Sequence, residues 1–417
     1  MDQHEGNARK VGWDEAGMGP SAEQLGFDPE NPTFLADPYP VFEAMRAERG
    51  PIWSERSNRW LVSDHATCAR LLRSPALHRH YHPRSPEGEW SAFNRLNMDG
   101  ILDIEGPRHD RIRRWLSPAF TRSGLDRIRD RVERACDVVI SRALDHVGSQ
   151  GELDLVTDVF EPLPAVVICQ ILGIDEDLGP QFREWSIAFV RMFDFAVSED
   201  DQQAGLAAAE ALASTMGGLL EEGAACPGSL LDELQRRRDM GDLTTHEAIA
   251  NAVLLFNGGT GAVVNALGNG FVQLLNRSEE RQKAREDGSA ALVAEEFLRF
   301  DAPLQAFERV VQTPLQVGDH EFIEGDRVSL LLGSANRDAA VFAQPDTFDV
   351  HRSIGPTLTF GAGSHFCLGA PLARLELQSL IPRLLTALPR MELTGDPQVE
   401  RSFVVRGYTS IPVLIRS

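Results

Sequence analysis

Residues 360–369 read FGAGSHFCLG and carry the strongest signal in the 417-residue chain. They place Cys367 on a glycine-rich loop, directly before a run of helix formers that predicts a helix over 370–388. The free N–H groups at a helix start carry partial positive charge and stabilise a thiolate, which is the form of cysteine that binds metal. Phe360 can shield the sulfur from water, and Gly363 and Gly369 let the backbone approach a flat partner. The pattern predicts that Cys367 is a metal ligand.

The metal that suits this pattern is iron held in a porphyrin. A thiolate with no second cysteine or histidine close by does not suit a closed zinc site, which takes four protein ligands. It suits haem, because the porphyrin supplies the in-plane ligands and the thiolate favours O–O cleavage. A dinucleotide-binding loop is excluded, since Phe366 stands where the third glycine belongs. For the cysteine alone, the alternative is an ordinary buried apolar cysteine.

The ten residues resemble the cysteine loop of the cytochromes P-450, FxxGx(H/R)xCxG, and further landmarks of that family follow in order over roughly residues 35–415. The resemblance implies a mainly α (α+β) fold, with a large helical domain and a smaller β-rich region. It implies haem b (iron protoporphyrin IX) as cofactor, with Cys367 as the axial ligand of the iron. It also implies that Glu296, Arg299 and Arg352 form a buried ion-paired triad behind the loop, which serves folding and haem retention.

The same resemblance implies a set of further haem contacts. His109 and Arg113 lie one turn apart in GPRHDRIRRW and match the family's HxxxR pattern for a haem propionate. Arg309 matches a second propionate contact, and guanidinium groups suit carboxylates. One departure is Thr357, at a position where many bacterial members have histidine. The expected cofactor-binding residues are Cys367, Phe360, Gly361, His365, Gly369, His109, Arg113 and Arg309.

Residues 244–276 predict a long helix that is apolar nearly all round and therefore belongs in the core. It resembles the family helix over the oxygen-binding face, where (A/G)Gx(D/E)T(T/S) supplies an acid and an alcohol that relay protons. Here the acid position falls on Gly261 and the alcohol position on Ala262. Thr260 is about 200° round the helix from Ala262, so it would need a local bulge to substitute. Asn257 is a further candidate for holding water.

The absence of the acid and the alcohol affects which reaction the protein can catalyse. Proton delivery by a positioned acid typically contributes about 10²–10⁴-fold to a rate. The substrate can supply the acidic group itself, the reaction can need only hydrogen or electron abstraction, or the enzyme can use peroxide. The first two together are favoured.

By resemblance, a substrate pocket lies between the loop of residues 78–100, the segment 182–195, the long helix and two segments near 305 and 404. Aromatic side chains there favour a large, flat or aromatic substrate, although each can equally be core packing. The expected lining residues are Trp90, Phe93, Phe189, Phe193, Leu304, Phe307, Phe403 and Val404.

Composition narrows the setting. A net charge of −21 disfavours nucleic acid or an anionic membrane as the main partner. Five widely spaced cysteines with no CxxC pair favour a reducing cytoplasm over a disulfide framework. The polar residues 1–20 predict a disordered lead without a signal peptide or anchor, followed by a single catalytic domain over 21–417.

The sequence therefore predicts an oxidoreductase acting on a bulky, aromatic specialised metabolite, by hydroxylation or by oxidative coupling or cyclisation. Its expected partners are a small-molecule substrate and, as electron donors, a ferredoxin and a ferredoxin reductase. One alternative keeps the haem in a peroxide-driven peroxygenase. Another, of a different class, is a catalytically silent protein that binds haem or substrate.

Overall fold

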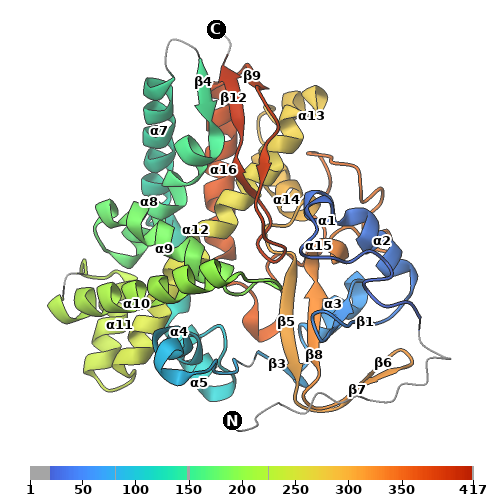
Figure 1. Ribbon diagram of the computed structural model, residues 1–417. Coiled ribbons are helices and arrows are strands. Elements are labelled where there is room, and N and C mark those ends of the chain that lie inside the picture. The colour runs from blue at the N-terminus through green and yellow to red at the C-terminus, as the bar shows by residue number, and fades with distance from the viewer. Residues whose placement is uncertain (1–18, 80, 148–150, 224, 416–417) are drawn as a thin grey trace.

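One long helix, α12 (Thr245–Leu275), runs through the middle of the molecule (Figure 1). It begins at a capping box, in which the Thr244 hydroxyl accepts the N–H of Glu247 and the Glu247 carboxylate accepts the N–H of Thr244. Because apolar residues occupy almost every face of the helix, it is stable only when other elements cover it. The computed structural model describes residues 19–79, 81–147, 151–223 and 225–415.

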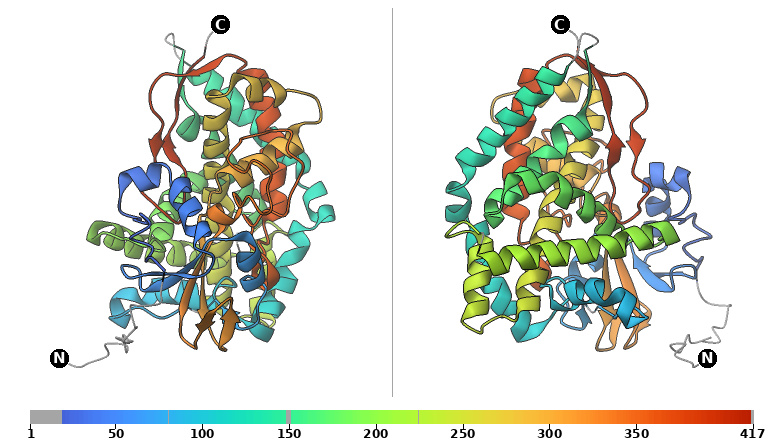
Figure 2. Two further views of the ribbon diagram at one scale, coloured as in Figure 1. Left: turned by 90° about the vertical axis from the view of Figure 1, so that its right-hand side faces the viewer. Right: turned by 60° about the vertical axis from the view of Figure 1, so that its left-hand side comes forward.

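Helices pack around α12 and form the larger half of the molecule. Those in contact with it are α4 (Glu87–Asp99), α8 (Pro162–Leu172), α9 (Gly179–Arg191), α10 (Glu199–Glu222), α11 (Leu230–Asp239), α13 (Ser278–Lys283), α14 (Ala290–Phe300) and α16 (Ala370–Ala387). The remaining helices are α1 (Pro32–Ala36), α2 (Tyr39–Ala47), α3 (His65–Leu71), α5 (Gly106–Leu116), α6 (Arg122–Asp126), α7 (Arg129–His146) and α15 (Leu332–Ala335). Figure 2 shows α10 crossing in front of α12, so the two helices are not parallel neighbours.

The smaller half contains a five-stranded sheet of order β1-β2-β8-β5-β3. Its strands are β1 (Ile52–Ser54), β2 (Arg59–Val62), β3 (Leu77–His78), β5 (Ala306–Val311) and β8 (Arg327–Leu331). Only β2 and β8 pair in parallel, with Trp60 opposite Val328. Smaller sheets join β4 (Glu152–Asp154), β12 (Pro412–Ile415) and β9 (Met391–Leu393), then β6 (Leu315–Val317) and β7 (His320–Phe322), and β10 (Gln398–Val399) and β11 (Tyr408–Ser410). The strands of the main sheet lie beside the helical half (Figure 1).

The mainly helical fold with small β regions confirms the fold class predicted from the sequence. The helix predicted over 370–388 is α16, and the apolar helix predicted over 244–276 is α12. Of the predicted lead over residues 1–20, residues 1–18 lie outside the described part of the chain.

α12 is long and apolar enough to cross a membrane by length and composition, and it is the one such helix among the described residues. However, 61% of its most apolar window is buried inside the molecule. Its apolar character is therefore explained by its place in the core.

Candidate active site

The cysteine loop is a tight turn held by its own backbone. The N–H of Cys367 donates to the carbonyl of Phe360 (2.9 Å), which closes the loop just before α16 begins. Gly361 (φ 68°) and Gly363 (φ 76°) adopt the left-handed region that favours glycine. A Cβ on Gly363 would lie 2.5 Å from the carbonyl oxygen of Leu72. Gly363 therefore allows the loop to pack closely against the end of α3.

Cys367 is an exposed residue, although protein atoms lie close around its sulfur. Burial raises the pKa of the Cys367 thiol, while the N–H groups of Gly369 and Ala370 and the nearby Arg113 and Arg374 lower it. The helix start therefore acts in the predicted direction, but burial outweighs it. A thiolate here depends on a bound cation, which a haem iron would supply.

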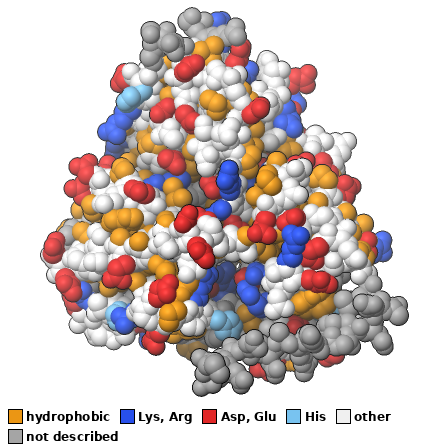
Figure 3. Space-filling view, viewed as in Figure 1, with side chains coloured by type: hydrophobic (Ala, Val, Ile, Leu, Met, Phe, Trp, Pro, Cys, Tyr) orange, Lys and Arg blue, Asp and Glu red, His pale blue; other side chains and the backbone are white. Residues whose placement is uncertain are grey.

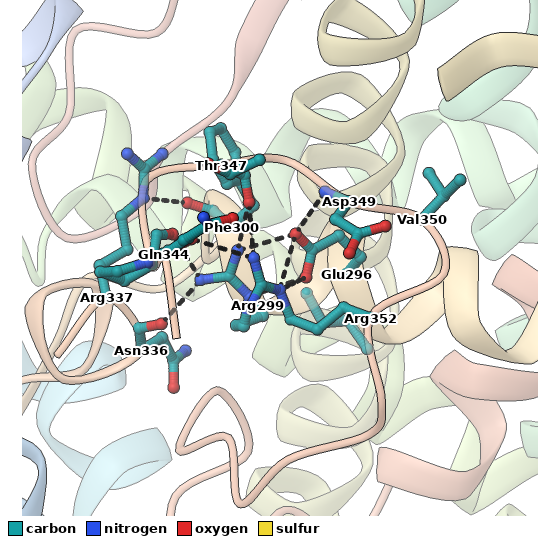
Figure 4. Close-up of polar contacts among 12 residues, drawn as sticks. Glu296, Arg299, Phe300, Asn336, Arg337, Gln344, Thr347, Asp349, Val350 and Arg352 are labelled. Atoms are coloured by element: carbon teal, nitrogen blue, oxygen red, sulfur yellow. Dashed lines mark hydrogen bonds and ion pairs between the residues drawn. The ribbon is translucent and has the colours of Figure 1, made fainter. Parts of the chain in front are cut away.

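Behind the loop, Glu296, Arg299 and Arg352 lie together (Figure 4). The Nε and Nη2 of Arg299 each donate to one oxygen of Glu296 at 2.7 Å, a bidentate pair with Arg299 only 2% exposed. Arg352 Nε lies 3.3 Å from Glu296 Oε2. A buried ion pair is tolerated when hydrogen bonds satisfy its remaining donors. Arg299 Nη1 meets this condition, because it donates to the carbonyls of Asn336 (3.0 Å) and Pro345 (2.8 Å).

Asn336 links the triad to the cysteine loop. Its side-chain oxygen accepts the N–H of Leu358 (2.7 Å) and its amide donates to the hydroxyl of Thr359 (2.8 Å), directly before Phe360. The Thr359 hydroxyl donates in turn to the carbonyl of Leu298 in α14 (2.7 Å). The loop that carries Cys367 is thus fixed to the helix that carries the triad. No sequence pattern had indicated Asn336 or Thr359.

At the edge of this region, His109, Arg309 and His365 line a cavity of about 340 Å³. Burial lowers the pKa of Arg309 to about 9, and the nearby Arg79 adds to this effect. Arg309 is buried with one hydrogen bond, from Nη1 to the carbonyl of Glu308, and the buried His109 Nε2 has no protein partner. Buried donors that lack an anion are what the two propionates of a haem would satisfy. These residues fit the cofactor.

Two neighbours of this cavity depart from the expectations. Glu105 lies 3.0 Å from His365 Nε2 and accepts the N–H of Arg79 (2.8 Å), contacts that lower its pKa despite the effect of burial. Sequence reasoning missed Glu105, although it directly precedes GPRH. Arg113 does not line the cavity. Its Nη2 donates to the carbonyl of Phe366 (2.7 Å) in the cysteine loop.

The centre of α12 has an open face. Gly258 is exposed although it belongs to a core helix, and a Cβ there would meet no atom within 4 Å. Ala262 lies four residues later on the same face. Thr260 does not serve this face, because α12 is unbroken and its buried hydroxyl donates to the carbonyls of Phe256 (3.2 Å) and Asn257 (3.4 Å) of its own helix. The local bulge that Thr260 would need is not present in α12, and its catalytic role stays a prediction.

Gly261 points toward a neighbouring helix. A Cβ on Gly261 would lie 3.7 Å from Nη1 of Arg183 in α9. Asn257, one turn earlier, is buried, and neither atom of its amide has a hydrogen-bond partner. The position of the missing acid thus lies beside a polar group that the sequence had not indicated.

Four of the expected pocket residues form a distal aromatic cluster of Trp90, Phe93, Phe189 and Phe193. The ring centroids of Phe93 lie 4.8 Å from Phe189, 5.7 Å from Phe193 and 5.7 Å from Trp90. The guanidinium of Arg84 lies over Trp90 and Phe93. Because Phe93 is fully buried, the cluster joins α4 to α9 and packs as core in this structure.

The other four pocket residues divide into two groups. Leu304 forms an isolated β-bridge with Val405, the residue after Val404. Phe307 is half-buried and lies against Gly361 of the cysteine loop. Phe403 is a correction, because it is buried in an N-terminal aromatic cluster with Phe27, Phe34, Phe42 and Phe195. Its ring is core packing.

Acidic side chains are scattered over the face in Figure 3, which is hollowed between the helical and strand halves, where basic side chains gather. Among the described residues, no group of three or more His, Cys, Asp or Glu side chains could hold a metal ion. Cys367 is thus the candidate ligand that remains.

Comparison with known proteins gives the same answer as the geometry. A family model described as Cytochrome P450 matches residues 224–401. The chain is 30% identical over 390 residues to the biotin biosynthesis cytochrome P450 of Bacillus subtilis, covering 91% of this chain and 96% of that protein. It is 31% identical over 393 residues to the cytochrome P450 monooxygenase PikC of Streptomyces venezuelae, covering 91% of each.

Solved structures extend the likeness to the fold. P450BioI in complex with hexadec-9Z-enoic acid ligated acyl carrier protein superposes with a TM-score of 0.86 at 28% identity, over 92% of this chain and 99% of that one. The tirandamycin C-bound P450 monooxygenase TamI gives 0.82 at 31% identity, over 93% and 99%. Fold and thiolate loop together define a haem-thiolate oxygenase. The chain belongs to the cytochrome P450 family and is a monooxygenase.

The haem-thiolate cofactor of the family activates dioxygen when it is bound. Of the chain's own residues, Cys367 would supply the ligand, Phe360 would shield the sulfur, and Arg309 and His109 would offer donors to the propionates. The guanidinium of Arg374 lies over the ring of Phe360 (4.6 Å) and pairs with Glu295, which keeps the shield in place.

Proposed function

We propose that this protein oxidises a bulky, aromatic small molecule of specialised metabolism, in one catalytic domain over residues 21–417 in the cytoplasm. A ferredoxin and its reductase supply the electrons. The observation that carries the proposal is the exposed Gly258 in the core helix α12, where a Cβ would meet no atom within 4 Å, together with the aromatic side chains of α4 and α9, which both contact α12. Two similar proteins are named for large metabolites, 6-deoxyerythronolide B hydroxylase (31% identical) and tirandamycin C-bound TamI.

The absence of the acid–alcohol pair favours a second outcome beside hydroxylation. With Gly261 and Ala262 at those positions, a reaction that needs little proton delivery, such as oxidative coupling or cyclisation, is less affected than hydroxylation. A substrate that carries its own hydroxyl or acid also meets the demand. Both outcomes use the same cofactor and the same pocket.

The substrate is found by a spin-state screen of the ferric holoenzyme against aromatic cyclic dipeptides, aromatic polyketides and macrolides. We expect aromatic members to shift the Soret band, because they fit an apolar pocket with few polar contacts. A shift produced by the macrolides alone, with none from the aromatic compounds, contradicts the proposed substrate class.

The reaction type is tested with the double variant Gly261→Asp/Ala262→Thr. We expect formation of the native product to stay level or fall, because the native reaction does not rely on that pair. A strong rise contradicts the proposal of a specialised reaction. Turnover with hydrogen peroxide alone, compared with ferredoxin and reductase, separates the peroxygenase alternative, which requires the peroxide reaction to be the faster.

A further inference from the structure

A polar group from three separate elements surrounds the position of the missing acid. Glu161, directly before α8, pairs with Arg183 of α9 at 3.0 Å (Oε1 to Nη2). The other terminal nitrogen of Arg183, Nη1, is the atom 3.7 Å from the Cβ position of Gly261. A carboxylate at position 261 would therefore reach the same guanidinium that Glu161 now holds.

The exposed fraction falls from Glu161 through Arg183 to Asn257. The side chains of Glu161 and Arg183 are 30% and 12% exposed, and Asn257 is 8% exposed. Arg183 Nε and both atoms of the Asn257 amide are buried and have no partner among the described residues. Unsatisfied buried polar atoms are rare in proteins and are usually explained by ordered water. Asn257 lies on the same face of α12 as Gly261, one turn away.

We propose that Glu161 and Arg183 replace the absent acid as the proton entry to the oxygen side of α12. Glu161 takes a proton from bulk water and releases it inward along water held by Arg183 Nε and Asn257. Monooxygenation consumes two protons and two electrons per dioxygen, and the redox partner supplies the electrons. Arg183 stays charged throughout and is a positioning residue. The inference rests on the monooxygenase activity and is independent of the substrate class proposed above.

The local packing explains why the entry uses these residues. Thr260 is unsuitable, because its hydroxyl is directed to its own backbone. Gly259 is closed, since a Cβ there would lie 2.8 Å from Ile168 of α8. Gly261 follows these two positions, and a Cβ there would lie 3.7 Å from Nη1 of Arg183.

The test compares Glu161→Gln with Glu184→Gln in the holoenzyme. Glu184 is the exposed neighbour of Arg183 in α9, so its substitution removes the same charge one residue away. With NADPH, ferredoxin and reductase and no added substrate, we expect Glu161→Gln to slow oxygen-dependent NADPH oxidation about 10- to 100-fold, at or below the lower end for a positioned acid. Its solvent hydrogen isotope effect should rise, while the reduction rate under carbon monoxide stays unchanged. Equal rates in the two variants would overturn the proposal.

A second variant separates proton entry from a structural role. Adding Gly261→Asp to Glu161→Gln should restore most of the lost rate, because it returns a carboxylate to Arg183. The same change is visible without turnover. Thermal unfolding of the cofactor-loaded protein should show that Glu161→Gln and Arg183→Gln are non-additive, and that Gly261→Asp removes this non-additivity. Failure to restore the rate in a variant with a normal carbon monoxide spectrum would overturn the proposal.

Discussion

The two sides of the expected haem plane are built in opposite ways. On the thiolate side, Cys367 sits on a loop whose every bend is fixed by hydrogen bonds, and Arg299 has four partners behind it. On the oxygen side, the centre of α12 contains Gly258, Gly261 and Ala262. Gly258 is exposed, and no ionisable side chain stands at the acid position. Hydrogen bonds and ion pairs fix the thiolate side, whereas small residues leave open space on the oxygen side. We conclude that the side that carries the iron ligand is held in one arrangement, whereas the oxygen side is adapted to the particular reaction.

The largest effect is expected on the thiolate side, from Cys367→Ala. Without a sulfur ligand the carbon monoxide complex should lose the red-shifted Soret band of a thiolate-bound haem, and monooxygenase turnover should be abolished. Cys136→Ala is the matched control. Burial raises the pKa of Cys136 to about 12, so it stays a thiol and its loss should leave the band unchanged. A retained band in Cys367→Ala would refute the assignment of the ligand.

The second expectation concerns stability behind the loop. Arg299→Ala removes the main partner of the Glu296 carboxylate, which stays buried. The free energy of unfolding should therefore fall by about 3–5 kcal/mol. Arg56→Ala removes an exposed pair with Asp28 and should cost at most about 1 kcal/mol. Urea unfolding of both variants, with haem retention followed by absorbance, measures the difference. Similar losses of unfolding free energy in the two variants would show that the burial of the triad does not make its ion pair more important for stability than an exposed one.

The third expectation lies at the edge where the two sides meet. Because burial lowers the pKa of Arg309, its charge opposes folding of the cofactor-free protein, fully below pH 9 and less as pH rises above it. Arg309→Leu should therefore stabilise the cofactor-free form. The same change should weaken haem binding by about 1.5–3 kcal/mol, the contribution of a hydrogen bond to a charged group.

Transfer of haem to an excess of apomyoglobin measures the loss, and thermal unfolding at pH 7 measures the gain. Opposite signs in the two experiments identify Arg309 as a cofactor contact. A parallel loss in both would make it a purely structural residue.

The smallest expected effect compares two glycines of α12. A Cβ on Gly270 would lie 1.9 Å from the ring of Phe297, so Gly270→Ala should destabilise the protein by about 1–3 kcal/mol through overpacking. Gly258→Ala meets no protein atom, and its higher helix propensity should add about 0.5–1 kcal/mol. It should nevertheless alter the spin state or ligand affinity, because its methyl enters the open face. Equal destabilisation would show that this face is closed.

Local sequence was sufficient where function depends on consecutive residues. The loop 360–369, the helix after it, the long apolar helix and the ion pair of Glu296 and Arg299 are all encoded within a few turns of chain. Most of the fold and the ligand were therefore predictable. The network through Asn336 and Thr359 was not, since it joins segments that no periodic pattern connects.

Aromatic residues show the same limit. Phe93 and Phe403 are equally apolar in sequence, and both were expected to line a pocket. Phe403 instead packs with rings of the N-terminal segment, more than 350 residues earlier in the chain. A hydrophobic side chain carries no directional information about its neighbours, because burial is favourable against any apolar surface.

The sequence by itself predicted the ligand Cys367, and it determined the loop that carries it, the helix that follows and the absence of an acid and an alcohol at positions 261 and 262. Those features depend on residue type and on spacing within one element. Only the tertiary structure decided what stands in place of the acid. Glu161 and Arg183 pair across the start of α8 and α9, and the guanidinium comes close to Gly261 because both helices pack on α12. Charge and hydrogen-bond partners across elements are set by packing, which local sequence does not encode.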